Sequence, residues 1–115
     1  MDFKKIKDAA FKNNLFKNAK VLRTKNSIEI HLKEAVEINA IQLMEAISMG
    51  QRIVKFEVSG GNDVKKFETF AKGTTVGHKR IITFPTQKLK YFRIYISESK
   101  ATPMISEVSG YLFAN

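Results

Sequence analysis

The sequence contains no cysteine and no tryptophan, and only two prolines. The absence of cysteine excludes disulfide bonds and cysteine-ligated metal sites. No apolar run approaches the ~20 residues that a membrane-spanning helix needs, so we expect no membrane span. The first residues, MDFKKIKDAAF, are charged and have no apolar core, so we do not expect a secretory signal there. The 115 residues, 43% of them hydrophobic, suffice for one domain with its own core.

The net charge of +9 is concentrated near the N-terminus. Residues 1–25 contain eight Lys or Arg against two acidic residues, whereas the rest of the chain has twelve against nine. We therefore predict a basic leader over residues 1–25 and a domain with an ordinary mixed surface over residues 26–115. The sequence lacks the interleaved aromatic and basic residues typical of single-strand binders, so we expect no nucleic-acid partner.

Hydrophobic periodicity predicts a change of secondary structure along the chain. The spacing of Phe3, Ile6 and Ala10 predicts a helix over residues 2–17. Further along, apolar residues alternate with polar ones or form short runs, which predicts strands. These strands cover residues 28–32, 37–45, 54–58, 64–71, 79–85, 91–97 and 104–113. Seven or eight strands with no helix between them predict an all-β fold, an antiparallel β-sandwich or jelly roll.

Glycine and aromatic residues add local expectations. The sequence SGGND at 59–63 predicts the turn of a hairpin. Gly110 interrupts the last strand and predicts a bulge or bend. Phe67 and Phe70 have the pattern of core residues.

The sequence shows no motif of a phosphate-binding loop, a metal site or a catalytic nucleophile. The stretch GTTVGHKR at 73–80 has the glycines and cations of a phosphate-binding loop, but IITF follows, which predicts a strand and not the helix such a loop needs. The only two histidines, His31 and His78, belong to no ligand-spaced cluster, so we expect no metal site. No nucleophile elbow is present. We expect no catalytic residue in this chain.

Three loop segments carry polar groups that sandwich packing does not require: residues 44–52, 73–80 and 98–104. Planar polar side chains can bridge the neighbouring hydroxyl groups of a sugar. The candidate ligand-binding residues are Glu45, Gln51, Arg52, His78, Lys79 and Arg80. Alternatively, the cations are simply solvated, or pair with Glu45 and fix the loops. Tyr91 and Tyr95 are either surface platforms for a sugar ring or covers for a sheet edge.

Four motifs together resemble a known family. The segments at 41–58, 71–85 and 93–111 are similar to the C-terminal discoidin-like domain of bacterial α-L-fucosidases, a galactose-binding-like jelly roll of the coagulation factor V/VIII C type. The similarity extends over about residues 28–113. The motifs are Q-L-x-E at Gln42–Glu45, G-Q-R at Gly50–Arg52, G-T-T-x-G-x-K-R at Gly73–Arg80 and T-P-x-I-S at Thr102–Ser106.

The resemblance implies a non-catalytic accessory domain of a fucosidase, a glycoside hydrolase whose catalytic domain lies outside this chain. Such a domain would bind galactose- or fucose-type glycans weakly through its end loops, in the periplasm or outside the cell. Alternatively, it would dock on the catalytic domain and bind no ligand. Calcium occurs in the family, but this chain lacks the upstream Asp-Gly…Thr-x-Trp element that often forms its site. We expect no cofactor.

Overall fold

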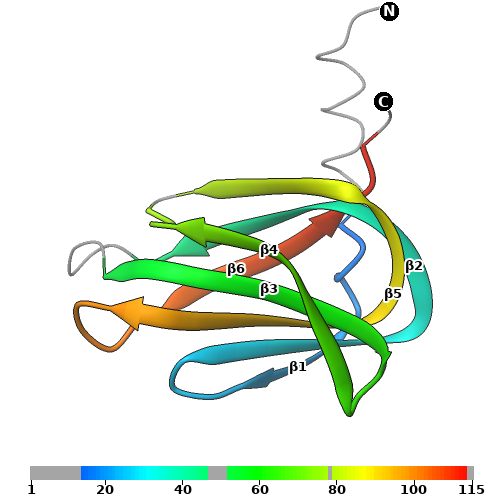
Figure 1. The fold of residues 1–115 in the computed structure, drawn as a ribbon, viewed down its shortest axis with the longest axis horizontal. Helices are drawn as coiled ribbons and strands as arrows, with labels where there is room; N and C mark the ends of the chain where they lie inside the picture. Colours follow the sequence, from blue (N-terminus) through cyan, green and yellow to red (C-terminus); the bar gives the residue numbers. More distant parts are fainter. Residues whose placement is uncertain (1–13, 47–51, 78, 114–115) are drawn as a thin grey trace, which may run out of the picture.

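The computed structural model describes residues 14–46, 52–77 and 79–113. This part of the chain contains six strands: β1 (Lys20–Arg23), β2 (Ser27–Glu45), β3 (Ile53–Asp63), β4 (Lys66–Thr74), β5 (Arg80–Ser99) and β6 (Ile105–Tyr111). All pairings are antiparallel, in the order β1-β2-β5-β3-β4, and β6 pairs with β2. Figure 1 shows that the strands curve over one another into two layers. The predicted all-β sandwich is confirmed.

Two long strands belong to both layers. Residues 27–31 of β2 pair with the second half of β5, and residues 40–43 pair with its beginning. Each of these strands was predicted as two, because the bend between the halves interrupts the alternation of the sequence. Pro85 does not end β5, since the register leaves it without a partner on β2 and no ladder hydrogen bond is lost.

The hydrophobic core lies between the layers. Cross-strand pairs such as Ile28 with Ile94 and Ile30 with Phe92 point into it, as the period-two pattern predicts. The largest fully buried side chains are Phe56, Phe92, Ile30, Ile38, Ile41, Leu43, Ile53, Ile94 and Val58, together with the polar Ser109.

The segment before β1 also joins the core. Residues 15–18 form a turn, and the Phe16 side chain is buried with its ring 5.0 Å from that of Phe92. The Asn14 side chain accepts hydrogen bonds from the N–H groups of Phe16 (3.0 Å) and Gly110 (2.9 Å). The predicted helix is therefore wrong for residues 14–17, because burial of Phe16 and bonding to β6 outweigh helical spacing. Residues 1–13 of that helix lie outside the described residues.

Strand β1 lies within the predicted leader, residues 1–25. This strand pairs with β2 in regular register, although residues 1–25 were predicted as a separate leader. The division into residues 1–25 and 26–115 stays a prediction. Among the described residues there is no helix of the length and hydropathy needed to cross a membrane.

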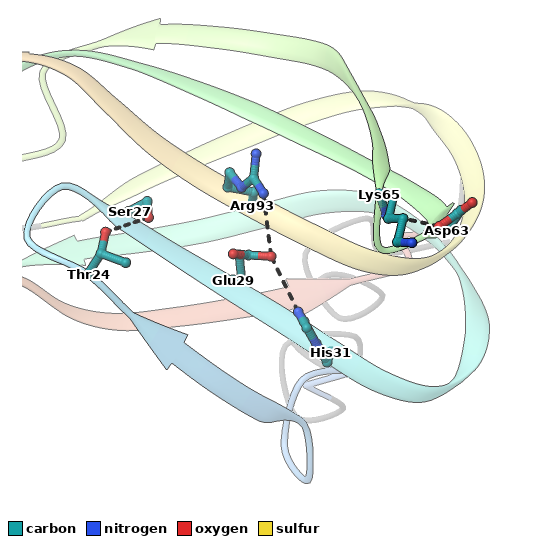
Figure 2. A network of polar contacts seen from close by, with 7 residues as sticks. All are labelled: Thr24, Ser27, Glu29, His31, Asp63, Lys65 and Arg93. Atoms are coloured by element: carbon teal, nitrogen blue, oxygen red, sulfur yellow. Dashed lines mark hydrogen bonds and ion pairs between the residues drawn. The ribbon is translucent and has the colours of Figure 1, made fainter.

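The β3–β4 hairpin is confirmed, but its turn lies further along the chain than predicted. The segment 59–63 belongs to β3, and the turn consists of Val64 and Lys65. The Lys65 N–H donates a 2.9 Å hydrogen bond to Asp63 Oδ1, drawn in Figure 2. An Asp side chain that accepts from the backbone two residues on is a common turn device, and it decides the position here.

The predicted bulge at Gly110 is wrong. Gly110 pairs regularly with Ile41, and the irregularity between β2 and β6 lies at Met44 and Glu45. The glycine instead makes room for the Phe16 ring. A close approach of a neighbouring group is the other common reason for a glycine within a strand.

The outer face of the β1-β2-β5-β3-β4 layer carries an aromatic and polar cluster. The Phe67 ring stacks on Tyr91 with centroids 6.5 Å apart, and the Arg93 guanidinium lies 4.5 Å from the Phe67 centroid. Glu29 lies 3.6 Å from Arg93 and 3.4 Å from His31, as Figure 2 shows. The prediction that Phe67 is a core residue is therefore wrong, because the residue covers this outer face.

Candidate functional site

The described parts of the three predicted loops meet at one end of the sandwich, on the left in Figure 1. There β3 and β6 begin, and β4 and β5 end. Backbone hydrogen bonds join the segments: Glu45 N–H to Gly77 C=O (3.1 Å), Ala46 N–H to Met104 C=O (2.9 Å) and Lys100 N–H to Arg52 C=O (2.8 Å). The end is thus a connected structure assembled from distant parts of the sequence.

Glu45 faces the interior of this end. It is 3% exposed, and its Oε2 atom accepts hydrogen bonds from the N–H groups of Arg52 (2.7 Å) and Ile53 (3.1 Å). Within the described part of the chain, its second oxygen, Oε1, has no hydrogen-bond partner. A carboxylate bound to two backbone N–H groups holds the start of β3 in place.

Arg52 ties two of the loops together. Its guanidinium Nη1 donates a 2.9 Å hydrogen bond to the carbonyl oxygen of Thr102. Glu45 therefore contacts Arg52 through the Arg52 backbone N–H and not through a side-chain ion pair, and at this end side chains fix the loops by bonding to main-chain groups. Both residues have a structural role, which leaves less of their hydrogen-bonding capacity for a ligand.

Of the other four predicted site residues, the structure describes two. Lys79 is exposed, and Arg80 is the half-buried first residue of β5, opposite Leu43. Gln51 and His78 lie outside the described residues. The strand that follows the GTTVGHKR segment is confirmed, which agrees with the exclusion of a phosphate-binding loop.

A hollow of about 380 Å³, which we call the end hollow, opens at the same end. Tyr95 lines it and is 39% exposed. The residues of the end hollow are Lys25, Asn26, Tyr95, Ile96, Ser97, Glu98, Ser99, Ala101, Thr102 and Pro103. It reaches the predicted loops through Thr102, whose carbonyl group accepts from Arg52.

The β1–β2 turn supplies one wall of the end hollow. A 2.6 Å hydrogen bond joins Thr24 Oγ1 and Ser27 Oγ across this turn, as Figure 2 shows. The Ile96 N–H donates a 2.8 Å hydrogen bond to the Asn26 carbonyl oxygen, which docks the turn on β5. Sequence reasoning missed Lys25 and Asn26, because only strand pairing brings them beside β5. Tyr95 was recognisable from its alternation with buried isoleucines.

The end hollow is lined by several kinds of chemical group. It combines an aromatic ring with hydroxyl, amide, ammonium and carboxylate groups. Glu98 lies 3.7 Å from Lys55 Nζ, and both side chains are more than half exposed, so this pair is weak and can rearrange around a ligand. Among the described residues there is no group of three His, Asp or Glu side chains that could hold a metal ion.

Comparison with known proteins gives the family. Residues 6–108 match the family model of the F5/8 type C domain. The chain therefore belongs to the F5/8 type C, or discoidin, family, and is a domain of the carbohydrate-binding-module type. The resemblance seen in the sequence is confirmed.

The individual proteins that this chain is similar to include fucosidases and glycoside hydrolases. The chain is 39% identical over 75 residues to a protein named as an α-L-fucosidase 1 of Oryza sativa subsp. japonica, with 65% of this chain covered. The chain spans only 14% of that relative's length. A solved structure of a glycoside hydrolase 29 family member from an unknown rumen bacterium is 27% identical, with a TM-score of 0.88, over 98% of this chain and 22% of that one.

A third comparison concerns the fold alone. The module CpGH89CBM32-5 from Clostridium perfringens, solved in complex with GalNAc-β-1,3-galactose, has a TM-score of 0.67 and 19% identity. The similarity covers 75% of this chain and 65% of that one.

Proposed function

We propose that this chain is the carbohydrate-binding accessory domain of an α-L-fucosidase, and that it binds galactose- or fucose-type glycans weakly through its end loops. The observation that carries the proposal is the end hollow, where the exposed Tyr95 ring lies among polar side chains of two segments that are far apart in the sequence, residues 25–26 and 95–103. Glu45, Arg52, Lys79 and Arg80, predicted from the sequence, are included in the proposed site, which adjoins the hollow at Arg52 and Thr102. Gln51 and His78 stay predictions, since they lie outside the described residues.

The chemistry of the end hollow matches a sugar. An aromatic ring can cover the apolar face of a pyranose, and the amide of Asn26 and the carboxylate of Glu98 can bind its hydroxyl groups. Because the hollow is shallow and buries little of a ligand, we expect dissociation constants in the millimolar range, on the order of 4 kcal/mol of binding free energy.

The relatives support the same proposal. The Oryza sativa relative is named as an α-L-fucosidase and the rumen-bacterium protein as a member of glycoside hydrolase family 29, and both are several times longer than this chain. The Clostridium perfringens module shows that a domain of this fold can hold a disaccharide. Hydrolysis itself would belong to a catalytic domain outside these 115 residues.

A second candidate function is docking on that catalytic domain without any ligand. Its support is the edge strand β1, where Val21 and Leu22 are both exposed, and the nearby Met104, 63% exposed. Exposed apolar side chains at a sheet edge are typical of a surface that another domain covers. The structural roles of Glu45 and Arg52 fit this alternative as well.

A heteronuclear NMR titration separates the two candidates. The ¹⁵N-labelled chain is titrated with L-fucose, galactose and N-acetyllactosamine, with calcium present. We expect saturable amide shifts at residues 25–26, 95–99 and 101–102, and smaller shifts in the loops beside them. Unchanged spectra at high millimolar sugar, in a folded sample, would contradict sugar binding and leave docking as the function.

A further inference from the structure

A second hollow, which we call the hairpin groove, lies at the other end of the sandwich. Its volume is about 570 Å³, within the range of small-molecule sites. It is lined by Gly60, Gly61, Asn62, Asp63, Lys66, Glu68, Thr69, Phe70, Gln87 and Leu89. Figure 2 shows Asp63 at the opposite end of the layer from Thr24 and Ser27, which flank the end hollow. Along β5, Leu89 and Tyr95 are about 20 Å apart at ~3.3 Å per residue.

Two glycines of the hairpin groove lie where neighbouring backbone approaches closely. A Cβ atom on Gly60 would lie 2.7 Å from the Tyr91 carbonyl oxygen, and one on Gly61 would lie even closer to that of Lys66. Neither position can carry a side chain, so the backbone itself forms this part of the groove. The β3–β4 ladder is also irregular between Gly60 and Asp63, and such bulges are common beside binding sites.

The groove has an apolar floor of fixed geometry. Leu89 is buried, and Phe70 is half-buried against the core. The Phe70 ring lies 4.6 Å from Phe84 at an angle of 57°, which holds it in one orientation. An ordered ring beside a leucine is a suitable surface for the apolar face of a pyranose.

The rim of the groove is polar, and although Asn62 and Asp63 make internal hydrogen bonds, part of the rim does not. Within the described residues, the side chains of Glu68, Thr69 and Gln87 make no hydrogen bond or ion pair. Their carboxylate, hydroxyl and amide groups supply both acceptors and donors. Asp63 and Lys66 add one charge of each sign, so the groove does not select for a strongly charged ligand.

We infer that the hairpin groove is a second saccharide-binding site, specific for a neutral pyranose with neighbouring hydroxyl groups. Phe70 and Leu89 contact the apolar face of the sugar, and Glu68, Thr69 and Gln87 bind its hydroxyl groups. With one site at each end, the domain would bind glycan chains bivalently, so that affinity for a branched or surface-bound glycan exceeds that for a free sugar.

The experiment is a titration of the full chain with galactose, L-fucose and N-acetyllactosamine, followed at both sites by amide shifts. We expect saturable shifts at residues 60–62, 68–70 and 87. The substitution Gln87→Ala removes one hydrogen-bonding group and should raise the dissociation constant at the groove about fivefold. The matched control is Lys88→Ala, since Lys88 is the exposed neighbour of Gln87 and does not line the groove; it should leave the constant unchanged.

The two proposals fail separately in this experiment. Shifts at the end hollow with none at the groove would overturn the second site and leave the proposed function intact. Shifts at the groove alone would keep the second site and remove the end hollow as the sugar site. Equal weakening by Gln87→Ala and Lys88→Ala would also overturn the inference, because the shifts would then not report contact with the groove.

Discussion

Gly110 lies directly against the Phe16 ring. A Cβ atom built on Gly110 would be 2.7 Å from Phe16 Cζ and 2.8 Å from the Cδ1 atom of Ile38, closer than real atoms approach. The backbone of Gly110 also bonds to the segment before β1, with its N–H donating to Asn14 and its C=O accepting from Leu15. The first described residues and the last strand are therefore built as one unit.

We expect Gly110→Ala to destabilise the domain, because the added methyl group must displace the buried Phe16 ring. Overpacking of this kind costs about 1–3 kcal/mol. The measurement is urea unfolding followed by circular dichroism. The control is Glu107→Ala on the same strand, which is exposed and should change stability by less than about 0.5 kcal/mol. Equal stabilities for the two variants would contradict the close contact.

The Glu45 carboxylate should be needed for the structure of the loop end. Glu45→Ala leaves the part-buried N–H of Arg52 and the buried N–H of Ile53 without their acceptor, which we expect to cost about 2–3 kcal/mol in the free energy of unfolding. Glu45→Gln keeps an acceptor of the same shape and should cost clearly less. If the two variants lost the same stability, the charge and not the hydrogen-bond geometry would be the essential feature.

Asn39 should hold the end of the described chain on β2. Its side chain donates to the Phe113 carbonyl oxygen (2.9 Å) and accepts from the Phe113 N–H (2.8 Å), as a neighbouring strand would. We expect Asn39→Ala to lower stability by about 1–2 kcal/mol and to accelerate hydrogen exchange of the Phe113 amide. Asn18→Ala, an exposed position, is the control. An unchanged exchange rate at Phe113 would show that other contacts hold this segment.

Tyr95 should be the main aromatic contact at the end hollow. We expect Tyr95→Ala to weaken sugar binding there about tenfold, equivalent to ~1.4 kcal/mol, whereas Tyr95→Phe keeps the ring and most of the affinity. Tyr91→Phe is the control, because Tyr91 lies on the same strand but contacts His31 and Phe67 instead. A loss as large for Tyr95→Phe as for Tyr95→Ala would assign the contact to the hydroxyl group.

The elements with a clear local signal were predictable. Alternation along residues 28–32 and 91–97 predicted strands with their correct inner faces, and the motifs around Glu45 and Arg52 led to the family. Two errors occur where a distant residue decides, whereas the displaced hairpin turn depends on the local contact between Lys65 and Asp63. The helix predicted for residues 14–17 is overruled by the core position of Phe16, and Gly110 makes room for that same ring instead of forming a bulge.

The candidate site also contains residues that the sequence indicates and residues that only the structure reveals. Tyr95 was visible as a surface aromatic, but Lys25 and Asn26 reach the end hollow only through the pairing of β1, β2 and β5. Glu45 has a carboxylate of the kind that binds sugar hydroxyl groups. Only the structure shows that this side chain faces inward and accepts hydrogen bonds from backbone N–H groups.

The sequence by itself determined the all-β class, the faces of the strands and the family, because period-two alternation and short motifs are local properties of the chain. Tertiary structure alone decided that four predicted strands form two, that Phe16 enters the core, and that two hollows open at opposite ends. These features depend on register and contact between residues far apart in the chain, and no local pattern of side chains encodes them.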